Sequence, residues 1–212
     1  MKFKLGIFDW NGTLLDDLNL VYGSVTAIFK YYNLKPPELA TYREKITAQF
    51  MNFYYGEGIP KTATGDDLNK IRKEYFEKHK DEVMLNKNAL ATLKKLKTMS
   101  MKTAIVSGEM AGYLQKRLKQ FEISHLFDKV CDGAYDKEKA LTQTLYYFRV
   151  KPEESFYVDD TEDGIKAAKK VGIKTFGFIH PNSYHSPERI LSAEPNYPIY
   201  SLDKIIYLAE NQ

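Results

Sequence analysis

The chain has 212 residues, of which 43% are hydrophobic and 28% charged, and its formal net charge is +3. That length allows one sizeable core with a small appended lobe. The 26 Lys and 5 Arg are scattered along the sequence rather than clustered in a stripe, which argues against nucleic acid as a partner. No apolar stretch approaches the roughly 20 residues that span a bilayer, and the single cysteine, Cys131, excludes an internal disulfide, so we expect a cytoplasmic chain with Cys131 in its core.

The first predicted element is a short strand at Leu5 to Phe8. Its continuous apolar run suits a strand buried on both faces of a parallel sheet. Asp9 follows directly, so the run is too short for the core of a signal peptide. In open α/β sheets, ligands bind outside the carboxyl ends of the strands, and the carboxylate of Asp9 is therefore a candidate functional group.

Asn11-Gly12 also allows a different interpretation of this region. Asn-Gly between two apolar runs is the strongest short signal for a two-residue β-hairpin. Three later fragments favour the parallel sheet. Ser107, Lys137 and the pair Asp159-Asp160 each lie beside a predicted strand or helix end, and they follow Asp9 in a fixed order.

Three helical segments come next, with no strand between them. Apolar residues spaced three and four apart predict a helix at about residues 18–32. A second helix covers about 38–55, and a third begins at Asp66 or Asp67 as its cap and carries the charged run from Lys70 to Glu82 on its outer face. We therefore expect an all-α lobe at residues 16–85, inserted into a core domain made of 1–15 and 86–212.

Strands and helices alternate after Leu90. We expect strands at residues 103–106, 129–131, 155–158 and 174–179, each preceded by a helix. This alternation implies an α/β fold with a doubly wound, Rossmann-like parallel sheet and right-handed crossovers. After His180 the pattern weakens, and three prolines (Pro187, Pro195 and Pro198) predict loops before a last helix at about 201–209.

The four polar fragments together resemble the motifs of the haloacid dehalogenase superfamily of phosphohydrolases and phosphotransferases, particularly its phosphoglycolate phosphatase and β-phosphoglucomutase branch. The first motif of that family, Asp-x-Asp-Gly-Thr, reads here as Asp9-Trp10-Asn11-Gly12-Thr13. The resemblance spans nearly the whole chain. It implies that the lobe at residues 16–85 is a cap over the active site and that the substrate is a small phosphorylated metabolite, phosphoglycolate-like or a sugar phosphate. The chain is expected to be a monomer or a dimer, with neither a membrane nor a nucleic acid as partner.

The resemblance assigns roles to the first two fragments. Asp9 would attack phosphorus and form an aspartyl-phosphate, which splits one displacement into two easier ones. Gly12 and Thr13 lie where a backbone turn could aim amide groups at a phosphate. Ser107 and Gly108 match the second motif, which holds a phosphoryl oxygen through the hydroxyl and an adjacent amide.

Lys137 best matches the third motif of the family, judged by its distance from the acid pair, and Lys139 is the runner-up. A cation there would stabilise negative charge on the attacked phosphoryl group and on Asp9.

Asp159 and Asp160 match the fourth motif. Adjacent carboxylates repel each other unless a cation joins them, and the resemblance implies that this cation is magnesium. Asp9, the Asn11 main-chain carbonyl and Asp160 would ligate the ion, with Asp159 acting directly or through water. Asp163 either assists or lies in the first turn of the next helix, where an acid suits the helix dipole.

Asn11 stands where the family usually carries a second aspartate, which acts as acid and base. An amide cannot shuttle a proton, and positioned acid–base catalysis contributes about 10²- to 10⁴-fold. We therefore expect a slow phosphatase, or one restricted to good leaving groups such as acyl phosphates.

Two other functions remain open, and a third, a receiver domain, is less favoured. The chain could be a catalytically impaired relative that binds phosphorylated ligands or a partner. It could cleave a carbon–phosphorus or carbon–halogen bond, in the first case with a cap lysine, Lys45 or Lys61, forming an imine. A receiver domain of two-component signalling would not need the helical insertion.

Substrate choice is expected to lie in the cap. Its candidate side chains are cations and aromatics that could bind a carboxylate, a sugar or a second phosphate: Arg43, Lys45, Phe50, Tyr54 and Tyr55. The histidines His125, His180 and His185 lack metal-ligand spacing and receive no role.

Overall fold

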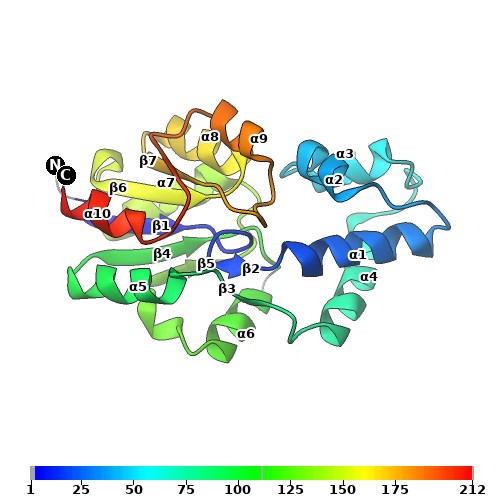
Figure 1. Cartoon of the computed structure of the whole chain (residues 1–212), viewed down its shortest axis with the longest axis horizontal. Helices are drawn as coiled ribbons and strands as arrows, with labels where there is room; N and C mark the ends of the chain where they lie inside the picture. The colour runs from blue at the N-terminus through cyan, green and yellow to red at the C-terminus, as the bar shows by residue number, and fades with distance from the viewer. Residues whose placement is uncertain (1–2, 111, 212) are drawn as a thin grey trace.

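The computed structural model describes residues 3–110 and 112–211. Its centre is a six-stranded, all-parallel sheet, which confirms the predicted α/β fold (Figure 1). The strands, in their order across the sheet, are β5 (Lys129–Cys131), β4 (Lys102–Val106), β1 (Leu5–Phe8), β6 (Ser155–Asp159), β7 (Lys174–Phe178) and β8 (Tyr197–Ile199).

Strand β1 lies in the middle of the sheet because its side chains are apolar on both faces. Leu5, Ile7 and Phe8 are fully buried. Leu5 and Ile7 pack on the face covered by α7 (Lys137–Phe148) and α8 (Glu162–Val171). Phe8 packs on the opposite face, which is covered by α5 (Ala89–Thr98), α6 (Tyr113–Gln120) and α10 (Lys204–Glu210).

Four helices follow β1 without an intervening strand of the main sheet, as predicted, and we call them the helical lobe. They are α1 (Leu18–Tyr31), α2 (Leu39–Lys45), α3 (Phe50–Gly56) and α4 (Gly65–Lys78). Figure 1 places them beyond one end of the sheet. At the base of the lobe, β2 (Leu15–Asp16) pairs antiparallel with β3 (Met84–Leu85). A domain boundary at residues 16 and 85 remains a prediction.

The helix predicted at residues 38–55 is wrong in one respect, because the chain leaves helical geometry between α2 and α3. Ile46 is extended, with φ −66° and ψ 140°. Two residues later, the Ala48 amide donates to the Asp163 carboxylate at 2.9 Å. The backbone groups freed by the break are therefore used in a contact with the core domain.

The cap of α4 also differs from the prediction. Thr64, rather than Asp66 or Asp67, is the N-cap. Its hydroxyl accepts from the Asp67 amide, and the Asp67 carboxylate accepts from the Thr64 amide, which makes a capping box.

The prediction of loops between His180 and the last helix was wrong at two prolines. Pro187 is the first residue of α9 (Pro187–Ser192), where a missing amide hydrogen costs nothing. Pro198 lies in β8, the edge strand of the sheet, where proline is tolerated. The last helix, α10, begins at Lys204.

Cys131, which we expected in the core, lies at its margin. Cys131 is half-buried in β5, with its sulfur 3.8 Å from the Thr144 hydroxyl. Among the described residues, no helix combines the length and apolar character needed to cross a bilayer.

Candidate active site

The site begins at the carboxyl ends of three adjacent strands. Asp9 follows β1, Ser107 follows β4, and Asp159 ends β6. These strands are parallel neighbours, with Phe8 paired to Ile105 on one side and Val158 on the other. The fold therefore brings fragments that are about 50 or 100 residues apart in the chain to one edge of the sheet.

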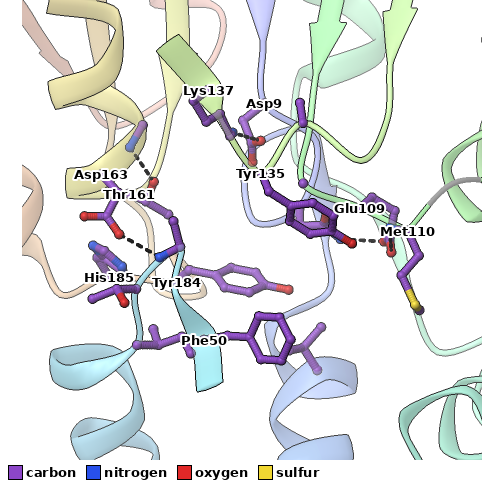
Figure 2. A pocket seen from close by; sticks show the side chains of 18 of the residues that line it. Asp9, Phe50, Glu109, Met110, Tyr135, Lys137, Thr161, Asp163, Tyr184 and His185 are labelled. Atoms are coloured by element: carbon purple, nitrogen blue, oxygen red, sulfur yellow. Dashed lines mark hydrogen bonds and ion pairs between the residues drawn. The ribbon is translucent and has the colours of Figure 1, made fainter. Parts of the chain in front are cut away.

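Lys137 joins the acids of this edge. Its ammonium group donates to Asp9 Oδ1 (Figure 2). It also donates to Asp159 Oδ2 at 3.2 Å and to the Tyr157 hydroxyl at 2.6 Å. Lys139 is exposed, and its backbone amide donates to the carboxylate of Asp136, which caps α7. The structure thus places Lys137, not Lys139, beside Asp9.

Burial and charge perturb the acids strongly. Burial raises the pKa of Asp9 to about 7, although Lys137 opposes this increase. Burial, with repulsion from Asp159 and Asp9, holds the pKa of Asp160 well above its ordinary range. Burial lowers the pKa of Lys137, but the attraction of Asp159 and Asp9 outweighs it and the net pKa is raised. One lysine therefore leaves the three carboxylates with excess negative charge.

The donor set fits a metal ion. Asp9, Asp159 and Asp160 are all buried, and one carboxylate oxygen of each lies within 4.8 Å of the others. Hard divalent cations bind such clustered oxygen ligands. The backbone around the cluster is matched to it, because a Cβ at Gly164 would lie 1.8 Å from Asp159 Oδ2.

Asn11 is held by two carboxylates that the sequence analysis did not assign. Its amide nitrogen donates to Asp17 Oδ2 at 2.7 Å and to Glu109 Oε2 at 2.9 Å. The side-chain oxygen of Asn11, Oδ1, accepts from the Ser107 hydroxyl at 3.3 Å. Burial raises the pKa of Asp17 to about 7, the hydrogen bond from Asn11 lowers it, and Glu109 raises it. The amide thus separates two acids that would otherwise repel each other.

Gly12 and Thr13 form a turn beneath the carboxylates. Gly12 has φ +72°, and a Cβ there would lie 2.3 Å from Asp160 Oδ2, so the turn requires glycine. Its amide donates to Asp17 at 3.0 Å, and the Thr13 hydroxyl donates to Asp160 at 2.9 Å. Neither residue lines the cavity described next, and their predicted contact with phosphate remains a prediction.

A cavity of about 240 Å³ connects the carboxylates to the helical lobe. From the core domain it is lined by Asp9, Asn11, Gly108, Glu109 and Lys137, among others. Figure 2 shows Asp9 and Lys137 on one side of this space and Phe50 of the lobe on the other. Ser107 lies behind the wall, where its oxygen accepts from the Glu109 amide at 3.0 Å.

Most of the predicted cap candidates lie elsewhere. Phe50 lines the cavity, but Arg43 donates to the carbonyls of Pro181 and His185. Lys45 forms an exposed ion pair with Glu57. The hydroxyls of Tyr54 and Tyr55 make hydrogen bonds with Arg72 and Ala63.

Sequence reasoning missed polar residues of the lobe that line the cavity, among them Asn69 and Arg72 on α4. It also missed Asp17 and Glu109. Each had a local signal: Asp17 is the second of two adjacent acids, and Glu109 directly follows Ser107-Gly108. His185, which received no role, lies in the wall, where its Nδ1 accepts from the Glu162 amide at 2.9 Å.

Comparison with known proteins gives consistent results. The family described as haloacid dehalogenase-like hydrolase matches residues 6–178. A phosphoglycolate phosphatase of Pasteurella multocida is 26% identical, with 99% of each chain covered. A phosphatase of phosphorylated carbohydrates from Thermotoga maritima is 25% identical, with 82% of this chain and 84% of that protein covered.

Solved structures share the fold. A predicted phosphatase from Clostridium acetobutylicum superimposes with a TM-score of 0.84 over the full length of both chains, at 18% identity. A predicted phosphoglycolate phosphatase from Haemophilus somnus gives a TM-score of 0.79 over 98% of both chains, at 21% identity.

Proposed function

Since the chain belongs to the haloacid dehalogenase-like hydrolase family, we propose that it hydrolyses a small phosphate monoester with magnesium and through a phosphorylated Asp9. The family and its phosphatase relatives establish a hydrolase of phosphate esters. The observation that carries the finer proposal is the convergence of Asp9, Lys137, Asp159 and Asp160 at one edge of the sheet, where Asp9 and Lys137 line a cavity.

Asp9 is the nucleophile in this proposal. One of its carboxylate oxygens forms a bond to phosphorus, the ester P–O bond breaks, and the leaving oxygen departs as an alkoxide or aryloxide that takes its proton from water. Water then attacks the acyl phosphate and frees Asp9. Lys137 donates to Asp9 Oδ1 and favours the ionised carboxylate, because its positive charge lowers the pKa of Asp9 against the increase that burial causes.

Asp9, Asp160 and the Asn11 main-chain carbonyl are the residues that would hold magnesium, with Asp159 beside them. When bound, the ion would offset the negative charge of the carboxylates and of the phosphoryl oxygens. Asp159 also has a positioning role, because its oxygens accept from Lys137, Tyr157 and the Thr161 amide.

Asn11 favours a slow enzyme or an impaired one. Its amide offers no proton to the leaving alcohol, so esters with good leaving groups are the expected substrates. Acyl phosphates and aryl phosphates belong to this class. A phosphonate-cleaving reaction through a cap imine has less support, because Lys137 is the only lysine among the described residues that line the cavity.

A phosphatase screen with magnesium tests the proposal. Wild type, Asp9→Asn and Asn11→Asp are compared on phosphoglycolate, sugar phosphates, acetyl phosphate and 4-nitrophenyl phosphate. Turnover that requires Asp9 and magnesium is expected on at least one ester. A metal-dependent burst of phosphorylated Asp9 without turnover would instead identify an impaired relative. Because Asn-Gly deamidates, peptide mass spectrometry must accompany the assay, and activity must not track the deamidated fraction.

A further inference from the structure

Arg72 of the helical lobe is a cation without a counterion. Its Nη1 donates to Asn69 Oδ1 and its Nη2 to the Tyr54 hydroxyl, both at 3.2 Å, and both acceptors are neutral. Its Nε is buried and has no hydrogen-bond partner in the part of the chain that the structure describes. The guanidinium also lies 5.5 Å from the centroid of the Phe50 ring.

Arg72 is half-buried, and a cation that is partly removed from water without a counterion is costly. Within the described residues, no carboxylate oxygen lies within ion-pair distance of Arg72. Glu109 attracts it across the cavity, but the Glu109 carboxylate already accepts from the Asn11 side chain and from the Met110 amide. The side chain lines the same cavity as Asp9 and Lys137. A ligand anion is the partner that this arrangement lacks.

Apolar and aromatic side chains make up much of the rest of the cavity wall. They include Val21, Ile46, Phe50, Phe76 and Met110. A ligand that reaches from Asp9 to Arg72 must place its middle against these side chains. Such a wall offers hydrophobic contact and few partners for the hydroxyl groups of a sugar. The volume of about 240 Å³ restricts the ligand to a small molecule.

We propose that Arg72 is a specificity-determining residue that binds a second anionic group of the substrate, so that the substrate is a phosphate monoester with an apolar middle and a distal carboxylate or phosphate. The inference rests on the proposed function for the phosphate end only. Both anions present planar or tetrahedral oxygens that a guanidinium binds with two N–H groups.

Three phosphonates that cannot be hydrolysed as esters test the inference by binding alone: phenylphosphonate, 4-carboxyphenylphosphonate and 1,4-phenylenebisphosphonate. Isothermal titration calorimetry with magnesium compares them. The two compounds with a distal anion are expected to bind wild type at least about tenfold more tightly than phenylphosphonate. An advantage for only one of them supports the inference and identifies the anion as carboxylate or phosphate.

Arg72→Gln is expected to reduce the advantage to within about twofold, and Arg72→Lys to retain part of it. Lys73→Gln is the matched control, because it removes one exposed positive charge from the same helix and should leave the advantage intact. If Arg72→Gln fails to fold, the affinities of wild type for the three compounds still show whether a distal anion strengthens binding. Equal affinity for all three, or no binding of any, overturns the inference.

Turnover separates this inference from the proposed function. Wild type that hydrolyses 4-nitrophenyl phosphate but shows no advantage for the distal anion overturns only the role of Arg72. A clear advantage without turnover on any ester overturns only the proposed hydrolysis.

Discussion

The substitution Asn11→Asp would supply the missing acid, but the structure predicts that it also creates a conflict. The Asn11 amide donates to Asp17 at 2.7 Å and to Glu109 at 2.9 Å. A carboxylate at this position turns both hydrogen bonds into repulsions. Each hydrogen bond to a charged group contributes about 1.5–3 kcal/mol, so the variant is expected to lose about 3–6 kcal/mol of unfolding free energy at pH 8.

The conflict should weaken in acid. At pH 5 a proton shared among the three carboxyl groups restores one of the two hydrogen bonds, and about half of the loss should disappear. Urea denaturation of wild type and variant at the two pH values measures this difference. If Asn11→Asp unfolds at the same urea concentration as wild type at both pH values, then the two carboxylates do not hold the Asn11 amide and the reasoning is refuted.

The exchange variant Asn11→Asp/Glu109→Gln separates stability from catalysis. It keeps the net charge and the hydrogen bond between positions 11 and 109, but places the acid next to Asp9. We expect it to recover about half of the lost stability and to raise turnover of a sugar phosphate at least about 10²-fold over wild type. Glu109→Gln alone is the control. A folded exchange variant that is no faster than wild type would mean that the missing acid does not limit turnover.

Lys137→Gln removes the cation from the buried acids and is expected to lower kcat at least about 10³-fold. Lys139→Gln is the control, and its kcat should stay within about twofold of wild type. Steady-state kinetics compares the two variants, and equal losses of kcat would contradict the assignment of Lys137. The pKa of Asp17 is raised to about 7 in the folded chain, whereas the unfolded chain loses this proton near pH 4. The free energy of unfolding should therefore fall as the pH rises from about 4 to 7. Asp17→Asn should flatten that fall in urea titrations, and an unchanged slope would contradict the raised pKa. Arg189→Ala removes the hydrogen bonds from Arg189 to the carbonyls of Arg43 and Ile46 at the end of α2. Hydrogen–deuterium exchange of the amides at residues 43–48, measured by mass spectrometry, should become at least about tenfold faster. Unchanged exchange would show that Arg189 does not stabilise this part of the helical lobe. Addition of magnesium should tighten binding of inorganic phosphate at least about tenfold by calorimetry, and metal-independent binding would argue against a metal in the carboxylate cluster.

The sheet and the convergence of its polar ends were predictable because they follow from local patterns. An apolar run that ends in an acid, such as Leu5 to Asp9, specifies both a buried strand and the place of its last carboxylate. The distance of Lys137 from Asp159 likewise favoured it over Lys139, as the structure has it. These features depend on chain order and on burial, and both are legible in one sequence.

The far end of the cavity was not predictable in the same way. Arg72 belongs to the charged run that was assigned to the solvated face of a helix, and only the packing of α4 against α1 and α3 turns it toward the cavity. Asn11 was recognised as a departure from the family, but its contacts with Asp17 and Glu109 join residues from separate elements. The break at Ile46 depends on Asp163, more than 100 residues later.

The charges at the two ends of the cavity suggest an order of binding. At the carboxylate end, three buried acids face one lysine, and two unit charges 4 Å apart interact by about 4 kcal/mol at an effective dielectric constant of 20. While these acids are ionised they repel a phosphoryl dianion, and a bound divalent cation would offset that repulsion. At the other end Arg72 is positive without any metal. A ligand with two anionic groups would accordingly be attracted first by its distal group, and the metal would then determine whether the phosphoryl group reaches Asp9.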